Sequence, residues 1–223
     1  TGAFVGFLDA DDLWAADFIR SHVMAHLGTG QANSFSCSDL GVISSDGRLL
    51  ASTWHQLAKP RGIRSDATQS SAVTPLNDIS ELVGASKGAS KGTPKGVSNG
   101  EILYAQHGWA AGWFFTPTSG CVFRKAMLDV IMPEDVETFR ISADYYLVMF
   151  SSLLSGALIL TRPLGFYRVH GENNFTKHPY LGSSFQPGPW DSPIPYNKAI
   201  LRHIDANFDR FAALFGGWRC ADL

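Results

Sequence analysis

The segment FVGFLDADDLW, residues 4–14, decides how the rest of the chain is interpreted. It begins as a short apolar run, which is typical of a buried strand. The run ends in Asp9, Asp11 and Asp12, whose charges repel one another unless a cation or several hydrogen-bond donors compensate them. Ligands of open α/β sheets bind beyond the carboxyl ends of the strands. The segment therefore predicts a strand that carries an acidic cluster to a ligand site.

A divalent cation is the simplest compensation for the acidic cluster. Mg²⁺ and Mn²⁺ prefer oxygen ligands, and they usually keep several waters while bridging to substrate phosphates. The alternative is structural: Asp11 or Asp12 would cap the following helix while the other carboxylates face solvent. The residues alone leave both interpretations open.

Composition indicates one well-packed domain that does not bind nucleic acid. Of the 223 residues, 45% are hydrophobic and 17% are charged, which is typical of a globular core. The net charge of −2 provides no basic surface for a phosphate backbone. Cys37, Cys121 and Cys220 are odd in number and lack CxxC spacing, which argues against a disulfide framework or zinc knuckle. We expect a reducing, cytoplasmic setting.

The pattern along the chain alternates helices and strands. A helix is predicted from about Ala15 to Leu27, which contains neither Gly nor Pro, and a β-hairpin around the Ser-Asp-Gly turn at 45–47. The uncharged stretch 145–160 is too short for a membrane span, so we expect a buried helix and then a strand. The remaining predicted elements are a strand at 121–123, helices at 125–131 and 143–155 with Ser142 as N-cap, and strands at 157–160 and 166–169.

Two segments differ in character from this core. Residues 64–100 lose apolar content and end in four similar tetrads, so we expect a flexible insertion whose lysines contact phosphates or acidic lipid only as a less favoured alternative. A helix from about Asn197 to Phe215 is predicted near the C-terminus. Its apolar face should dock on the core, and the alternative is a partner or a peripheral membrane contact. The face consists of Leu201, Ile204, Phe208, Phe211 and Phe215.

Three further motifs carry residue types that are suited to catalysis. Asp144 lies in the first turn of a predicted helix, where the helix dipole favours the ionised form that a general base requires, although such a position is also common in purely structural helices. The stretch YRVHGEN, residues 167–173, contains Arg168 and His170. The segment Thr116–Gly120 brings a glycine-containing loop ahead of the strand at 121–123.

Taken in order, these motifs resemble those of family 2 glycosyltransferases. FLDADDLW is similar to the DxD element of that family, Ser119-Gly120 to its SG segment, and YRVHGEN to its YRxHxxN element. Asp144 matches the second residue of the family's ED pair, in which this chain has Ala143 instead of Glu. The resemblance implies an α/β chain with a GT-A fold, which is Rossmann-like and contains a mixed sheet flanked by helices.

The same resemblance implies an inverting transfer of sugar from a nucleotide-diphosphate donor to a glycan, lipid-linked or protein acceptor. It implies Mn²⁺ or Mg²⁺ as cofactor, and a site at the inner face of the membrane is an alternative to a free cytoplasmic one. The implied roles are the base for Asp144, donor contacts for Asp9, Asp11, Ser119, Gly120 and Arg168, and metal coordination for Asp11 and His170.

The resemblance covers residues 1–175, which we expect to be a partial GT-A domain followed by the C-terminal loop and helix of 176–223. The nucleotide-binding portion of such a domain would precede Thr1, so we expect this chain alone to be inactive or nearly so. Two rivals stay open. One is a phosphohydrolase of the HAD type with Asp9 as nucleophile, although Asp12 stands where Thr or Val would be expected. The other is a non-catalytic glycan-binding module, which the Ala143 departure makes conceivable.

Overall fold

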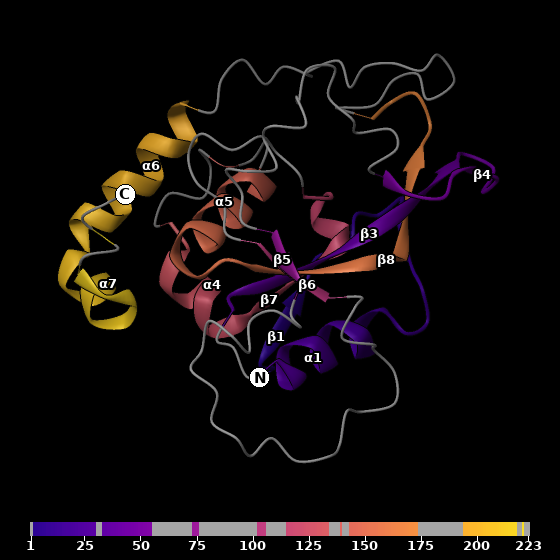
Figure 1. Cartoon of the computed structure of the whole chain (residues 1–223). Coiled ribbons are helices and arrows are strands. Elements are labelled where there is room, and N and C mark those ends of the chain that lie inside the picture. Colours follow the sequence, from indigo (N-terminus) through magenta and orange to yellow (C-terminus); the bar gives the residue numbers. More distant parts are fainter. Residues whose placement is uncertain are drawn as a thin grey trace, which may run out of the picture.

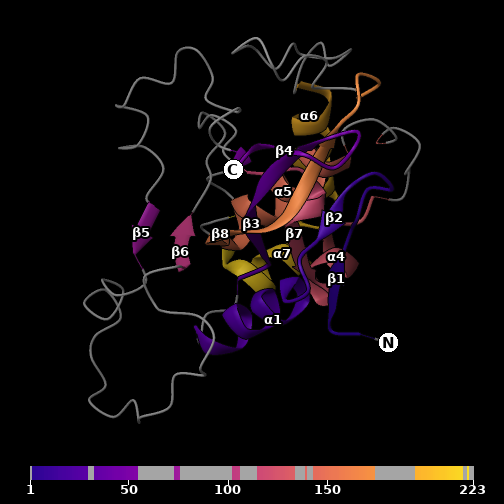
Figure 2. The ribbon, with the colours of Figure 1, turned by 90° about the vertical axis from the view of Figure 1, so that its right-hand side faces the viewer.

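A mixed β-sheet forms the centre of the protein (Figures 1 and 2). The computed structural model describes residues 2–29, 33–54, 73–75, 102–105, 115–133, 139, 143–173, 194–217 and 220. The strands follow the order β1-β7-β3-β8-β6-β5, with β2 paired to β8 and β4 paired to β3. Their bounds are β1 Phe4–Gly6, β2 Leu13–Trp14, β3 Phe35–Ser44, β4 Leu49–Ala51, β5 Val73–Pro75, β6 Ile102–Ala105, β7 Cys121–Arg124 and β8 Ala157–Val169.

Strand direction sets which ends meet at one edge of the sheet. β7 is antiparallel to both β1 and β3, and β3 is parallel to β8. Strands β1, β3 and β8 therefore run in the same direction, and their carboxyl ends lie at one edge. The predicted mixed sheet flanked by helices is confirmed.

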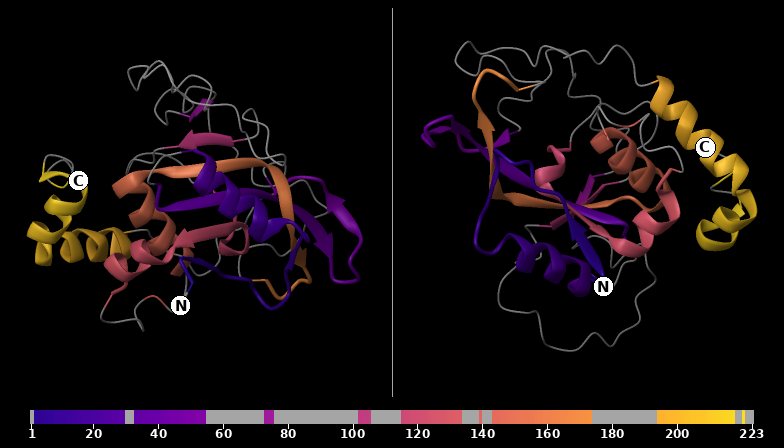
Figure 3. Two further views of the ribbon diagram at one scale, coloured as in Figure 1. Left: turned by 90° about the horizontal axis from the view of Figure 1, so that it is seen from below. Right: turned by 180° about the vertical axis from the view of Figure 1, so that it is seen from behind.

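Helices cover both faces of this sheet (Figure 3). The helix α1 packs on one face through Phe18 and Ala25 against Val122 and Leu158. The opposite face carries α4 and α5, and α6 and α7 pack outside them. The helix bounds are α1 Phe18–Gly28, α4 Lys125–Ile131, α5 Ala143–Ser155, α6 Ile194–Ala206 and α7 Phe208–Phe215, with a 3₁₀ turn η4 at Thr118–Gly120.

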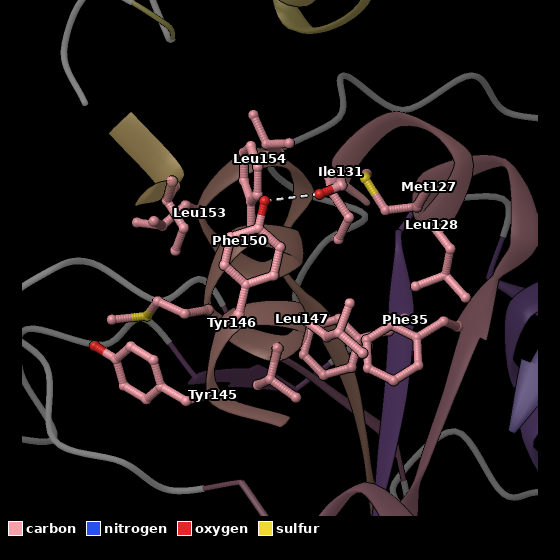
Figure 4. Close-up of a cluster of buried hydrophobic side chains, with 14 of the residues drawn as sticks. Phe35, Met127, Leu128, Ile131, Tyr145, Tyr146, Leu147, Phe150, Leu153 and Leu154 are labelled. Atoms are coloured by element: carbon pink, nitrogen blue, oxygen red, sulfur yellow. Dashed lines mark hydrogen bonds between the residues drawn. The ribbon is translucent and has the colours of Figure 1, made fainter. Parts of the chain in front are cut away.

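The helix α5 is the centre of the larger core. All side chains from Tyr145 to Leu154 are buried, and they contact the sheet, α4 and the C-terminal helices. Figure 4 shows this cluster, in which the Tyr146 hydroxyl donates to the Ile131 carbonyl over 2.8 Å. The expected buried helix followed by a strand at 145–160 is thus confirmed. Within the described residues, no helix is both long and apolar enough to cross a bilayer.

Several local predictions are confirmed. The hairpin of β3 and β4, α4 and α5 lie where the sequence places them, and α1 begins three residues later than expected, at Phe18. Ser142 and most of 64–100 lie outside the described residues. Within that segment, β5 pairs with β6, so at least Val73–Pro75 is part of the sheet rather than of a featureless insertion.

The prediction of two separate strands around Arg162-Pro163 is wrong. β8 continues from Ala157 to Val169, because it pairs in parallel with β3 on both sides of the irregularity. The register shifts next to Asp39, opposite Pro163, so the proline lies at an irregularity where no regular ladder hydrogen bond is required of it.

The prediction of one C-terminal helix is also wrong. Asn207 interrupts it with φ −126° and ψ 27°, and its side chain donates to the carbonyl of His203 over 3.0 Å. Asn competes in this way with the helical backbone. Leu201 and Phe208, predicted on the docking face, are each 41% exposed, whereas Ile204 and Phe211 are buried.

Two buried histidines occupy the inner face of α1. His22 and His26 are fully or almost fully buried, and a hydrogen bond of 2.7 Å joins His22 Nδ1 to the Ser36 hydroxyl. Burial, together with the neighbouring charge of His26, lowers the pKa of His22 to about 3. Burial and the charge of Arg124 lower the pKa of His26 to about 4. Both rings are therefore neutral in the folded protein at pH 7.

We predict that stability decreases as the pH falls below about 6.5 because of these histidines. Unfolded His has a pKa near 6.5, so below that pH both histidines bind protons in the unfolded chain but not in the folded chain. The contribution is complete above pH 6.5 and is lost as the pH falls toward 4, with a slope of up to about 1.4 kcal/mol per pH unit for each histidine. Urea unfolding at stepped pH would measure it. A His22→Gln variant with an unchanged slope would contradict the assignment.

We further predict opposite responses from two neighbouring phenylalanines. Phe211→Ala should lower the unfolding free energy by about 3–5 kcal/mol because the ring is fully buried and stacks on Phe150. Phe208→Ala is the matched control and should cost under about 1 kcal/mol, since its ring is exposed. Equal losses in thermal or urea unfolding would contradict this and would indicate a single continuous helix with Phe208 facing the core.

Candidate functional site

Three segments that are distant in the sequence meet at one edge of the sheet. The acidic loop, residues 9–12, follows β1, and a turn closes it through the Asp12 N–H, which donates to the Asp9 carbonyl over 3.1 Å. His170 follows the carboxyl end of β8, and η4 precedes β7, which runs the other way. The acidic loop reaches the end of β8 because β2, which follows it, pairs with β8 at Leu13 and Phe166, and it reaches η4 through the hydrogen bond between Asp9 and Ser119.

The most direct link between them is a side-chain contact between Asp11 and His170. Asp11 Oδ2 lies 2.8 Å from His170 Nε2, and both side chains are about one-third exposed. The other ring nitrogen, Nδ1, accepts the Glu172 N–H over 3.2 Å. Because Nδ1 accepts, the neutral ring carries its proton on Nε2 and donates it to Asp11.

Asn173 fixes the turn that presents His170. Its amide oxygen accepts the His170 N–H over 2.8 Å, and its amide nitrogen donates to the Arg168 carbonyl over 2.8 Å. Gly171 has φ +86°, in the left-handed region that favours glycine. The sequence motif includes Asn173 but gave no hint of this role, which depends on the folded turn.

Arg168 ties the acidic loop to the β3–β4 hairpin. Its Nε donates to the Asp11 carbonyl over 2.7 Å, and Nη1 donates to the carbonyls of Ser44 and Ser45 over 3.1 Å each. The resemblance implied phosphate oxygens as partners of this guanidinium. In the structure its donors hold backbone, so its first effect is to position the Asp11 loop.

Asp12 is a buried carboxylate that anchors the loop from the other side. Its Oδ1 accepts the Arg168 N–H over 2.9 Å. Burial raises the pKa of Asp12 to about 6, and the hydrogen bond from Arg168 offsets part of the increase. The alternative that Asp11 or Asp12 caps the next helix is wrong, because β2 intervenes and Asp17 is the N-cap of α1.

Ser119 joins the acidic loop to the glycine-containing segment. Its hydroxyl accepts the Asp9 N–H over 3.1 Å, and its carbonyl accepts Trp14 Nε1–H over 2.7 Å. Burial, and then the charge of Asp11, raise the pKa of Asp9. Sequence reasoning did not find the role of Trp14, whose ring also stacks on Phe18.

Gly120 is explained by packing. A Cβ at this position would collide with the Thr116 side chain and lie 3.0 Å from the Ser38 carbonyl. The resemblance implied that this glycine lets the backbone approach a donor sugar. The close approach that the structure contains is to β3, so Gly120 holds the loop against the sheet.

Asp144 lies in the first turn of α5, as predicted, and its Oδ1 accepts the N–H of Tyr145 over 2.8 Å. Burial raises the pKa of Asp144; the hydrogen bond from Tyr145 opposes this, and the charge of Asp9 adds to it. The structure thus brings Asp144 toward the edge at which the acidic loop lies.

Asp11 and His170 are the two side chains that a divalent cation would use here, with its other coordination positions filled by water or substrate. Asp11 provides a carboxylate and His170 an imidazole at the same point, while no group of three His, Cys, Asp or Glu side chains within the described ranges has metal-binding geometry. Coordination by His170 Nε2 would need the lone pair of that nitrogen. A metal there would replace the present hydrogen bond to Asp11.

Comparison with known proteins finds one relative. The chain is 29% identical over 175 residues to an uncharacterized glycosyltransferase of Nostoc sp. (strain PCC 7120). The match covers 78% of this chain and 42% of the relative, so the chain spans less than half the length of the protein that it resembles. No protein family description and no solved structure matches. The similarity supports a relationship to glycosyltransferases in general.

We predict that Arg168→Lys lowers the unfolding free energy by about 1.5–3 kcal/mol. A lysine ammonium cannot reach carbonyls in two separate loops with the geometry of the guanidinium fork, and charged hydrogen bonds contribute about this much. Arg48→Lys is the matched control: the Arg48 side chain is exposed and pairs, among the described residues, with Asp46 alone, so its change should stay within about 0.5 kcal/mol. Equal changes in urea unfolding would show that Arg168 does not hold the loop.

Proposed function

We propose that the chain is the catalytic part of an inverting, metal-dependent glycosyltransferase of family 2 with a GT-A fold. The contact between Asp11 and His170 carries the proposal, because these residues are 159 positions apart and belong to different motifs of the resemblance. Each motif alone has an ordinary structural explanation. Their meeting at one edge, where the charge of Asp9 contributes to the raised pKa of Asp144, is what a shared site requires.

The proposed substrate is a nucleotide-diphosphate sugar. Asp11 and His170 would hold Mn²⁺ or Mg²⁺, which would supply positive charge for the departing diphosphate. Arg168 would keep the carbonyl of Asp11, and with it the acidic loop, at a fixed distance from the β3–β4 hairpin. Any direct contact of Arg168 with phosphate would require at least one of its donors to leave a backbone carbonyl.

Asp144 is the proposed base. It would take the proton of the acceptor hydroxyl as that oxygen attacks the anomeric carbon from the side opposite the leaving diphosphate, which inverts the configuration. Burial raises its pKa above the ordinary value, which makes the ionised carboxylate a stronger base near neutral pH. Ser119 and Asp9, which contact each other, would line the position of the donor sugar.

The relative's name favours transfer over the two rivals. It is a glycosyltransferase rather than a phosphohydrolase, and no contact of Asp9 described above distinguishes a phosphoryl nucleophile from a donor-binding carboxylate. The identities of sugar, nucleotide and acceptor would be set by residues beyond those discussed here, and glycan, lipid-linked and protein acceptors all fit the proposal.

The test uses the complete polypeptide that contains this chain, with uridine, guanosine and thymidine diphosphate sugars and Mn²⁺, and measures nucleoside diphosphate release. Asp144→Asn should lower kcat by about 10²–10⁴-fold, because general-base assistance is worth this much, with little change in donor KM. Asp11→Asn should weaken the Mn²⁺ dependence of nucleoside diphosphate binding.

Asp129→Asn serves as the control for both variants. Asp129 is exposed and pairs with Lys125 on α4, away from the acidic loop, so its variant should keep full turnover. Near-normal kcat in Asp144→Asn would remove Asp144 from the role of base. Release of phosphate from simple esters without any sugar donor would favour the phosphohydrolase instead.

A further inference from the structure

Two buried cysteines face each other across neighbouring strands. Cys37 on β3 and Cys121 on β7 are directly paired in the antiparallel register. Directly opposite residues of such a pair point to the same face, with Cα atoms about 4.5–5.5 Å apart. This spacing lies inside the range of about 4.4–6.8 Å over which disulfides form. Both side chains belong to the core on the α5 side of the sheet.

The two thiols have unequal surroundings. Cys37 Sγ accepts the Thr116 N–H over 3.4 Å and lies 3.0 Å from the Thr116 hydroxyl oxygen, whereas the Cys121 thiol donates to the Pro117 carbonyl over 3.8 Å. Burial alone would raise the pKa of Cys37, but when the single S–H of Cys121 points to Cys37 instead of Pro117, it and the hydrogen bonds from Thr116 lower that pKa overall. The hydrogen bond to Cys37, and then burial, raise the pKa of Cys121.

We propose that Cys37 and Cys121 form a dithiol that hydrogen peroxide closes to a cross-strand disulfide. The Cys37 thiolate attacks a peroxide oxygen, the O–O bond breaks, and the products are a sulfenic acid and hydroxide, which takes up the proton that the thiol had lost. The Cys121 sulfur then attacks the sulfenic sulfur and releases water as its own proton leaves. Two thiols and one peroxide yield one disulfide and two waters.

Access determines which oxidant can react. Cys37 is 2% exposed and Cys121 is fully buried, so a protein disulfide cannot reach them, whereas peroxide is hardly larger than water. Cys121 is the first residue of β7 and lies one position beyond the last pair with β1, which joins Gly6 to Val122. The pair therefore lies at the end of the ladder, beside η4.

Closure would disturb the segment that carries Ser119. Oxidation removes the S–H that Cys121 donates to the Pro117 carbonyl and draws Cys37 Sγ away from Thr116. Those contacts hold residues 116–120 against β3, together with the Thr116 hydroxyl that donates to the Ser38 carbonyl over 2.9 Å. The dithiol itself is independent of the proposed transferase activity.

The test is peptide mapping of the folded chain after hydrogen peroxide treatment and alkylation of free thiols. We expect one peptide pair that joins Cys37 to Cys121, a mass lower by two hydrogens, and full reversal by dithiothreitol. Cys220→Ser is the matched control, since Cys220 is also buried but lies near the C-terminus, and its variant should still form the bridge.

The wild-type chain alone tests the disulfide proposal, so a variant that fails to fold does not affect the result. Cys37→Ala and Cys121→Ala, where they fold, should each abolish the bridged peptide pair. Free Cys37 and Cys121 in the folded chain, under peroxide that oxidises the urea-unfolded chain, would overturn the proposal. So would a bridge from either residue to Cys220.

Discussion

The parallel pairing of β3 with β8 is the constraint on which the site depends. It runs from Phe35 and Ala157 to Ser44 and Val169, and every residue of β3 is buried. β2, which follows the acidic loop, pairs with β8 at Leu13 and Phe166, so the loop lies beside the end of the strand that β3 holds in place. Without this pairing, His170 would not meet Asp11, and Arg168 could not reach both the acidic loop and the β3–β4 hairpin.

Concentrated negative charge is the main cost of this arrangement, and hydrogen bonds offset part of it. Asp12 is nearly inaccessible and accepts the Arg168 N–H, and a hydrogen bond with Ser119 opposes the effect of burial on the pKa of Asp9. Burial raises the pKa values of Asp9, Asp12 and Asp144 together. Several carboxylates with raised pKa values at one edge of a sheet are typical of a functional site rather than of a structural ion pair.

The sequence predicted the local elements best where a single segment determines its own structure. The helix α5 was predicted with its bounds, because a continuous apolar stretch lies between an acidic first turn and Gly156, which has φ +69°. The prediction failed where a partner strand overrides local signals. Arg162-Pro163 predicts a break between two strands, yet β8 continues through it because β8 pairs with β3 on both sides. The apolar spacing from Leu201 to Phe215 likewise concealed the interruption at Asn207.

The candidate site divides in the same way. Residue types and their order along the chain predicted Asp9, Asp11, Asp144 and His170 as site residues. Acidic clusters at strand ends and carboxylates at helix starts indicate chemistry that can be recognised without knowledge of the fold. Tertiary structure alone decided what those side chains touch. The role of the Arg168 guanidinium follows only from the structure, in which it donates to three carbonyls from two loops. The packing role of Gly120 and the pairing of Cys37 with Cys121 were likewise visible only in the structure. The register between strands is a property of the folded sheet and not of any single segment.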